Sequence, residues 1–324
     1  MNSKLKDYLR TKDWAQYISM YFNRRYKRNR NEVDIEEYLI NDYRSYYGTQ
    51  PDLQNPKKYS EFLLWQKLNM RDDVAPLLTD KIISKGFVKF LFGEEIHFPR
   101  TLKVFKNANE IHFGDLPNEC VIKCNHNSGY VFHFKKEVNN NYTIKNLRDK
   151  EHRRYSLFYV KKILNKLLKD NYYYNNFEWN YDGIAPRVFI EEYLETNDLR
   201  DYKFYMSMGE LICFHVVTNR QTDERNTFFD AKLTPLKYWA DVPPAETPPV
   251  LPKNIHKMIE FAKTLSRDYP AVRIDLYNIN ERIYFSEVTF FHMGGHLEYK
   301  EPSNFDELMG ENMTLPPNEH RKKI

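Results

Sequence analysis

The chain has 324 residues, of which 41% are hydrophobic, and its formal net charge is +4. This charge is too small to indicate nucleic-acid binding by itself, and no apolar run reaches the roughly 18 residues of a membrane-spanning helix. Three cysteines are too few for a disulfide framework, and the first residues lack the apolar core of a signal peptide. These features predict a cytoplasmic protein.

The N-terminal part of the chain is expected to be helical. Apolar residues follow helical spacing over residues 4–29. Basic residues gather over 24–30, namely Arg24, Arg25, Lys27, Arg28 and Arg30. A solvated helix end is the simpler interpretation, because cations suit the C-terminal end of the helix dipole. The alternative is peripheral contact with an anionic surface at the inner face of the membrane.

The remaining patterns indicate helices in the first half of the chain and strands in the second. In chain order they predict helices over 56–72 and 76–93, a strand, loop and strand over 120–134, a helix over 147–174, a strand over 187–195, a hairpin over 202–220, a helix over 254–269, a hairpin over 272–290 and a loosely ordered polar tail over 301–324. A few helices packed on antiparallel strands predict an α+β fold.

A lysine on an apolar strand precedes a short polar loop. Lys123 on this strand can neutralise a phosphate, and a Gly/Ser loop can lay backbone N–H groups over one. The pattern is not a P-loop, because it lacks the lysine-serine pair and the helix of that motif. An edge lysine without a ligand is the simpler interpretation. The loop residues of interest are Asn125, Asn127, Ser128 and Gly129.

Two acidic segments are further candidates for nucleotide contacts. Glu191 and Glu192 close an apolar strand, where a carboxylate can accept hydrogen bonds from an adenine amine or ribose hydroxyls. Acids that simply face solvent fit the same pattern. Asp201 and Lys203 share one face of a strand, since side chains two residues apart point the same way. A bridged surface pair is the simpler interpretation there.

The hairpin over 272–290 places Asp275 and Glu287 on opposite arms, in mid-strand positions where carboxylates are depleted. Facing carboxylates repel unless positive charge lies between them. Magnesium takes one or two carboxylates together with substrate phosphates and water, so it suits this pair. Thr289 shares the strand face of Glu287 and can add a hydroxyl, and Arg273 can meet an anion. A structural acid–arginine pair is the alternative.

Together, and in this order, these segments resemble a known family. The stretches "LPNECVIKCNHNSG", "APRVFIEEYLETNDLRDYKFY" and "AVRIDLYNINERIYFSEVTFFHMGG" are similar to the ATP-grasp family, specifically its teichuronopeptide-biosynthesis (TupA-like) branch. The N-terminal stretches "KYSEFLLWQKLNMRDD" and "LLTDKIISKGFV" resemble the same branch. The resemblance covers residues 55–300, and residues 1–54 match no motif of the branch.

The resemblance implies a fold and cofactors. It implies an α+β ATP-grasp fold, in which two α+β subdomains grip ATP, with a helical N-terminal region, and it implies ATP and Mg²⁺ as ligands. The implied boundaries are a helical N-terminal extension (1–54), an N-terminal α/β region (55–119), ATP-grasp subdomain 1 with the lysine strand, lid loop and hinge (120–195), ATP-grasp subdomain 2 with the metal-binding hairpin (196–300) and a polar tail (301–324).

The resemblance also implies a role for each matching residue. Lys123 matches the lysine that contacts the α-phosphate, and the loop over 125–129 matches a mobile phosphate lid. Lys203 is the candidate for a second phosphate lysine. The hinge that holds adenine matches Glu191, Glu192, Tyr193 and Leu194. The metal ligands match Asp275, Glu287 and Thr289, the last at a position where many relatives carry Asn.

Enzymes of this family usually convert a carboxylate to an acylphosphate, from which an amine displaces phosphate. The resemblance therefore implies an ATP-dependent, ADP-forming carboxylate–amine ligase in bacterial polysaccharide biosynthesis, joining an amino acid or peptide to a carboxylate, a uronic acid of a capsule or O-antigen. The alternatives are a glycosyltransferase of the same pathway class and an ATP-dependent glycan or small-molecule kinase. The candidate catalytic residues are Arg273, Arg225 and Lys203, with Arg187, His292 and His296 as further candidates for the acceptor pocket.

Overall fold

The computed structural model describes residues 34–112, 114, 116–138, 141–149, 153–194, 199–220 and 222–317. The helix expected over 4–29 and the basic cluster over 24–30 lie outside the described residues. The chain divides into two compact units. Unit 1 consists mainly of Pro99–Phe177 and Tyr181–Tyr193, and unit 2 of Ile35–Phe98, Glu178–Asn180 and Leu194–Ile324.

Unit 1 is built on an antiparallel sheet of five strands in the order β1-β5-β2-β3-β4. The strands are β1 (Thr101–Phe105), β2 (Glu119–Cys124), β3 (Val131–Lys136), β4 (Tyr142–Asn146) and β5 (Val188–Glu192). Helix α7 (Leu157–Leu167) buries Val160, Ile163 and Leu164, whose spacing forms one apolar helix face, and packs against β2. The core of unit 1 therefore lies between this helix and the sheet.

Helix α7 is shorter than the helix predicted over 147–174, so that prediction is wrong in extent. The segment before it is tied to β4, because the backbone N–H of Tyr155 donates to the carbonyl of Ile144 at 2.8 Å. Ser156 then caps the helix, accepting a hydrogen bond from the N–H of Tyr159 at 3.3 Å. These two contacts fix the start of the helix.

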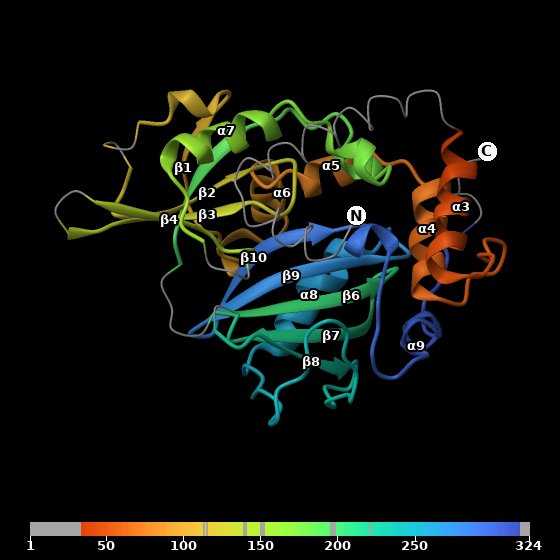
Figure 1. Cartoon of the computed structure of the whole chain (residues 1–324). Coiled ribbons are helices and arrows are strands. Elements are labelled where there is room, and N and C mark those ends of the chain that lie inside the picture. Colours follow the sequence, from red (N-terminus) through yellow and green to blue (C-terminus); the bar gives the residue numbers. More distant parts are fainter. Residues whose placement is uncertain are drawn as a thin grey trace, which may run out of the picture. The chain divides into compact units, whose positions relative to one another are not determined.

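Unit 2 is built on a second antiparallel sheet of five strands, in the order β10-β9-β6-β7-β8. The strands are β6 (Arg200–Ser207), β7 (Glu210–Thr218), β8 (Arg225–Asp230), β9 (Val272–Ile279) and β10 (Arg282–Thr289). Helix α8 (Ile255–Ser266) packs on one face of this sheet, as Figure 1 shows. Phe204, Phe214 and Ile274 are fully buried and belong to that apolar face.

Both predicted hairpins are present in this sheet. β6 and β7 are joined at Met208 and Gly209, whose φ angles are 49° and 83°. β9 and β10 are joined at Asn280 and Glu281, with φ angles of 52° and 61°. Two successive residues with positive φ give the turn whose twist matches that of paired strands.

The N-terminal helices of unit 2 are α3 (Ile35–Tyr47), α4 (Tyr59–Asn69), α5 (Val74–Thr79) and α6 (Ile83–Phe92). The single helix predicted over 76–93 is wrong, because Asp80 separates α5 from α6. Its Oδ1 accepts hydrogen bonds from the N–H groups of Ile82 and Ile83, at 2.8 and 3.2 Å, and so begins a new helix. Short 3-10 helices are η2 (Gly93–Glu95), η3 (Ala108–Glu110), η6 (Tyr172–Asn175), η7 (Trp179–Tyr181) and η8 (His292–Gly295).

The tail predicted to be loosely ordered contains a packed helix, so that prediction is wrong over the residues of α9 (Phe305–Gly310). Phe305 and Met309 are 0% and 2% exposed, and α9 packs against α4. Two apolar residues at i and i+4 form the buried face that a short helix needs. Among the described residues, no helix has both the length and the apolar character needed to cross a bilayer.

Candidate active site

A row of polar side chains crosses the sheet of unit 2 on the face opposite α8. Glu287 on β10 lies directly opposite Asp275 on β9, Asp275 lies opposite Lys203 on β6, and Lys203 lies opposite His215 on β7. Directly opposed residues share a sheet face, so the four side chains form one row. The predicted juxtaposition of Asp275 and Glu287 is therefore present in the hairpin.

A β-bulge brings Glu287 into this row. Phe285 pairs with Leu276 and Glu287 pairs with Asp275, so Ser286 is an extra residue between two consecutive pairs. If the strands paired regularly, Ser286 would lie opposite Asp275, and Glu287 would lie opposite Ile274 and point to the apolar face. A shift of one residue in the register turns every later side chain to the other face. Bulges are common beside active sites, where they redirect a side chain.

Asp275 is fully buried and is held by two cations. Arg273 donates from Nε to Oδ1 at 2.7 Å and from Nη2 to Oδ2 at 2.9 Å, and Lys203 Nζ makes a short contact with Oδ2. Burial alone would raise the pKa of the Asp275 carboxyl, but Arg273 and then Lys203 hold this pKa below its ordinary value. The carboxylate is therefore ionised without any bound metal.

Lys203 also connects Asp275 to a second buried acid. Its Nζ lies 3.0 Å from Oδ2 of Asp201, and Nη2 of Arg220 donates to the same oxygen at 2.8 Å. Lys203 and Asp201 are 7% and 3% exposed, so the interpretation as a surface pair is wrong. Two carboxylates thus meet three cations, Lys203, Arg220 and Arg273, which leaves one positive charge in excess.

Glu287 and Thr289 complete the face. Glu287 Oε2 lies 3.8 Å from Lys81 Nζ, and Thr289 Oγ1 accepts a hydrogen bond from Arg273 Nη2 at 3.3 Å. Protein cations already contact each carboxylate, so the hairpin is compatible with folding before any ion binds.

The donor set nevertheless fits a magnesium ion. Asp275 accepts three hydrogen bonds from Arg273 and Lys203, whereas a carboxylate has about four acceptor directions. One direction remains for a cation, and Glu287 and Thr289 present hard oxygens beside it. The described residues contain no group of three or more His, Cys, Asp or Glu residues suited to a metal. Substrate oxygens would have to complete the shell, as is usual for magnesium.

In unit 1, Lys123 on β2 is paired with Glu191 on β5. The Nζ–Oε2 distance is 2.7 Å, and Nζ also lies 5.3 Å from the ring centroid of Phe189. Glu191 is 5% exposed, so its interpretation as a solvent-facing acid is wrong. A partly buried lysine beside a buried acid forms a charged site on the sheet face, where either group can meet a ligand.

The loop over 125–129 has one fixed end and one exposed end. Asn125 Oδ1 accepts from the N–H of Arg187 at 2.7 Å, and its Nδ2 donates to the carbonyl of Ala185 at 3.1 Å. Ser128 and Gly129 are exposed, and Gly129 has a φ of 97°, which other residues rarely adopt. Two exposed residues at the tip leave backbone groups accessible, as a phosphate-binding loop needs. The loop's role as a lid stays a prediction.

The predicted hinge begins with Glu191 and Glu192, the last two residues of β5. Glu192 is bound by Arg100, with Nε 2.5 Å from Oε2, and Tyr193 stacks on His133 with ring centroids 4.2 Å apart. Leu194 comes next and is partly exposed. No sequence pattern marks Arg100 or His133, because their contacts join elements far apart in the chain.

Among the remaining acceptor candidates, His292 lies within electrostatic range of Asp275, Arg273 and Lys203, whereas Arg225, His296 and Arg187 contact other groups. Arg225 begins β8, three strands away from β9, and pairs with Asp223 at 2.7 Å. His296 pairs with Asp42 at 2.8 Å. His292 lies beside Tyr205, with ring centroids 5.6 Å apart. The guanidinium of Arg187 donates to the carbonyl of the preceding residue at 2.7 Å. Their roles at an acceptor site stay predictions.

Sequence reasoning missed three residues of this cluster. Lys81 and Arg220 lie in loops, so no strand pattern marks them. His215 did carry a signal, because an imidazole interrupts the otherwise apolar run "LICFHVV". Burial lowers the pKa of His215 well below its ordinary value, and Lys203 and Arg273 lower it further.

Comparisons with known proteins give one family and several distant structures. The family model described as TupA-like ATPgrasp matches residues 61–314, which is more than half of the chain. No curated protein matches the chain. Among solved structures, the chain is similar to D-alanine–D-alanine ligase from Helicobacter pylori, with 16% identity over 80% of this chain and 68% of that chain and a TM-score of 0.42.

Two further solved structures are similar at the same distant level. One is D-alanine–D-alanine ligase from Bacillus anthracis complexed with ATP, with 15% identity over 66% of this chain and a TM-score of 0.32. The chain spans only 54% of the length of that ligase. The other is L-amino acid ligase from Bacillus licheniformis, with 9% identity over 72% of this chain and 46% of that chain and a TM-score of 0.37.

Proposed function

The chain belongs to the TupA-like ATP-grasp family, as its motifs predicted, and from this premise we propose that it is an ATP-dependent, ADP-forming carboxylate–amine ligase. Its α+β architecture agrees with that family. The observation that carries the proposal is the row formed by Glu287, Asp275 and Lys203, with Arg273 beside it. Opposed carboxylates next to the buried cations Lys203 and Arg273 suit a metal ion and a phosphate chain together.

The proposal gives each charged residue a role. Lys203 and Arg273 would bind the terminal phosphates and stabilise the charge that develops as the γ-phosphoryl group moves. Lys123 and the exposed end of the 125–129 loop would bind phosphates nearer the nucleoside. The hinge candidates Glu191, Glu192, Tyr193 and Leu194 would hold the adenine. Asp275, Glu287 and Thr289 would hold Mg²⁺, which when bound neutralises phosphate charge and orients the phosphate chain.

The proposed reaction has two steps. In the first, an oxygen of the substrate carboxylate attacks the γ-phosphorus, the bond to the bridging oxygen breaks, and ADP leaves with that electron pair. In the second, an amine attacks the carbonyl carbon of the acylphosphate, inorganic phosphate leaves, and the amine loses a proton. The protein's contribution to both steps is positioning and fixed charge, because the phosphate of the intermediate is already a good leaving group.

The substrates are proposed from the TupA-like branch. A uronic acid would supply the carboxylate, and an amino acid or peptide would supply the amine, in the assembly of a bacterial surface polysaccharide such as a capsule or O-antigen. Such substrates match the chemistry of the site, since no serine, cysteine or histidine nucleophile is needed for acyl transfer through a phosphate. Cytoplasmic location and contact of residues 24–30 with a membrane surface are part of the same proposal.

The proposal is tested by incubating the full-length chain with ATP, Mg²⁺, a panel of uronic acids and a panel of amino acids. An amide product with ADP and phosphate supports the ligase. A phosphorylated hydroxyl on the sugar would show a kinase instead. Consumption of a nucleotide-sugar without ATP would show a glycosyltransferase. If the protein is a ligase, Glu287→Gln should abolish turnover, whereas Glu260→Gln on the solvent-exposed side of α8 should not.

A further inference from the structure

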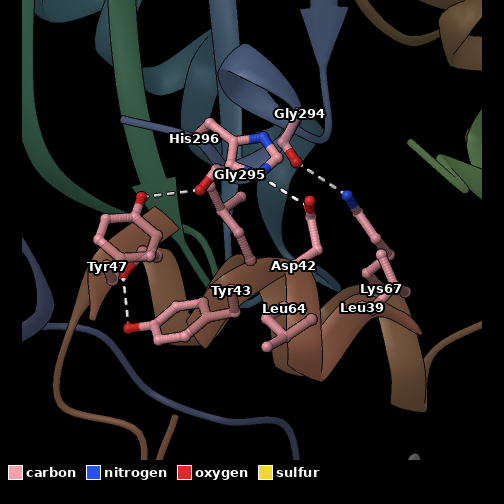
Figure 2. A pocket seen from close by; sticks show the side chains of 11 residues that line it. Leu39, Asp42, Tyr43, Tyr47, Leu64, Lys67, Gly294, Gly295 and His296 are labelled. Carbon is pink, nitrogen blue, oxygen red and sulfur yellow. Dashed lines mark hydrogen bonds and ion pairs between the residues drawn. The ribbon is translucent and has the colours of Figure 1, made fainter. Parts of the chain in front are cut away.

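A recess in unit 2 lies between three elements, α3, α4 and η8, as Figure 2 shows. The space between these elements is about 310 Å³, part of which is open to solvent, so the recess is not an enclosed cavity. Leucine side chains of α3 and α4 form part of its lining, and a few polar groups converge beside them. Apolar side chains beside a small number of placed polar groups are also found in ligand sites.

The most unusual polar group in the recess is the ammonium of Lys67. Lys67 is 4% exposed, and its Nζ donates to the carbonyl of Gly294 at 2.9 Å and lies 5.3 Å from the ring centroid of Phe291. No carboxylate among the described residues lies within ion-pair distance of Nζ. An ammonium has three donors, so Lys67 keeps donor capacity that the protein does not use.

A buried cation without a paired anion is costly, and a ligand can remove that cost. Burial lowers the pKa of Lys67, while Glu178 and Asp42 raise it without contacting it. A carboxylate placed in the recess would supply the missing counter-charge and accept two charge-assisted hydrogen bonds. The position of this ammonium therefore points to an anionic group in the ligand.

The walls of the recess are fixed by hydrogen bonds. Tyr47 donates to the carbonyl of Gly295 at 2.8 Å and accepts from the N–H of Leu297 at 2.9 Å. His296 is bound to Asp42, as Figure 2 shows. Met293, Gly294 and Gly295 have successive φ angles of 52°, 67° and 93°. These contacts hold η8 in a conformation that is otherwise rare, which preorganises the site.

The recess is also close in sequence to the proposed reaction centre. Strand β10 ends at Thr289, and the chain then enters η8, whose Gly294 carbonyl meets Lys67. Four residues lie between Thr289 and Gly294 in the sequence. The same stretch of chain therefore carries the metal candidates Glu287 and Thr289 and one wall of the recess.

We propose that this recess binds the carboxylate group of a small substrate through Lys67. The inference rests on the proposed function, which requires one substrate with a carboxylate and a second with an amine. The carboxylate can belong to either substrate. One source is the amino acid that supplies the amine, whose own carboxylate does not react. The other source is the uronic acid. Ser60 and Tyr43 would face the rest of the molecule.

Titration calorimetry on the full-length chain tests this proposal with matched probes. The pairs are L-alanine against ethylamine, and glucuronate against glucose, each with and without Mg²⁺ and a non-hydrolysable ATP analogue. Within at least one pair, the carboxylate should bind and its counterpart should not. Lys67→Met should weaken that binding at least about tenfold, since one charge-assisted contact is lost. Lys263→Met, which removes a lysine of α8, should leave the affinity unchanged.

The comparison between probes uses the wild-type chain, so the proposal can still be contradicted even if Lys67→Met does not fold. Leu64→Phe gives a second variant, which narrows the recess without changing its charge and should also weaken binding. The pair that responds identifies the source of the carboxylate. Binding of neither carboxylate probe to the wild type, or equal affinity in Lys67→Met, would overturn the proposal.

The recess and the proposed function fail in different ways. Lys67-dependent carboxylate binding in a chain that forms no amide would support the recess and contradict the ligase. Amide formation with unchanged affinity and unchanged KM in Lys67→Met would support the ligase and contradict the recess. A purely structural role of Lys67 would lower the Tm of Lys67→Met without changing the affinity of the folded variant for either carboxylate.

Discussion

Arg273 donates two parallel hydrogen bonds, of 2.7 and 2.9 Å, to the carboxylate of Asp275, which lies two residues further along the same strand. Side chains two apart on a strand share a face, which allows this fork-shaped contact. The arginine thereby neutralises one member of the acidic pair before any ligand arrives. It also places a guanidinium where a phosphate would meet the carboxylates, which the proposed mechanism requires.

Asp275→Asn should destabilise the chain as well as abolish ATP turnover. The substitution leaves Arg273 and Lys203 buried without their shared anion, and breaking a buried pair in this way costs about 3–5 kcal/mol. Asp275 contributes stability that is present above its unfolded pKa and is lost as the pH falls below it. Urea unfolding at neutral pH measures the loss.

The control is Asp223→Asn, which removes the acid of the exposed pair with Arg225. Its stability should change little, because exposed pairs contribute little. Asp275→Asn as stable as the wild type would contradict the assigned role of Arg273 and Lys203. If no cation held Asp275, the same substitution would relieve acidic repulsion and leave the stability level or higher.

Lys123→Met should weaken binding of ATP by about 1.5–3 kcal/mol, since a charge-assisted hydrogen bond to phosphate is lost. This loss corresponds to roughly a tenfold to hundredfold rise in Kd. Calorimetric titration with ATP and Mg²⁺ measures the Kd for ATP in the wild type and in the variant. Lys135→Met, which removes an exposed lysine of the neighbouring strand β3, should bind ATP normally. Unchanged affinity in Lys123→Met would remove this residue from the site.

Stability should fall as the pH drops below about 6.5, the ordinary pKa of histidine. Burial and the nearby cations keep His215 neutral in the folded chain, so the unfolded chain binds the extra proton. The slope of unfolding free energy against pH is then positive in this window. His215→Gln should reduce this slope between about pH 6.5 and 5. His256→Gln on the exposed side of α8 should not, and equal slopes in both variants would argue against the buried neutral state.

Gly310→Ala should be strongly destabilising, because its Cβ would lie 2.0 Å from the carbonyl oxygen of Lys57. The added Cβ would clash with backbone atoms of Lys57 and Lys58, which cannot move away as the end of a flexible side chain can. Gly86→Ala in α6 is the matched control, since its Cβ would meet nothing within 4 Å. That change should stabilise by about 0.5–1 kcal/mol through helix propensity. Thermal unfolding of the two variants should give Tm shifts of opposite sign.

The hairpin of β9 and β10 was predictable, because alternating apolar residues and a polar turn mark it directly. The opposition of Asp275 and Glu287 also followed from the sequence. The bulge at Ser286 had a visible signal, since the apolar positions change parity between Phe285 and Val288. The turn at Asn280 and Glu281 sets the pairing of the two strands. With this pairing, the change of parity requires one extra residue in β10.

Other features could not come from sequence alone. The pairing of Lys203 with both Asp201 and Asp275 depends on β6 lying beside β9, and these strands are separated by more than 60 residues. Lys67 lies in an apolar helix and looks like a surface lysine until α3 and η8 enclose it. Such contacts depend on tertiary packing, which local periodicity does not encode.

The most direct test of the central claim is product analysis of one reaction mixture. With ATP, Mg²⁺, the carboxylate substrate and no amine, added hydroxylamine should trap the acylphosphate as a hydroxamate. With the amine present, ADP, phosphate and amide should form in equal amounts, because each turnover breaks one bond to the γ-phosphorus. Formation of AMP and pyrophosphate instead would contradict phosphoryl transfer at the site of Asp275 and Glu287.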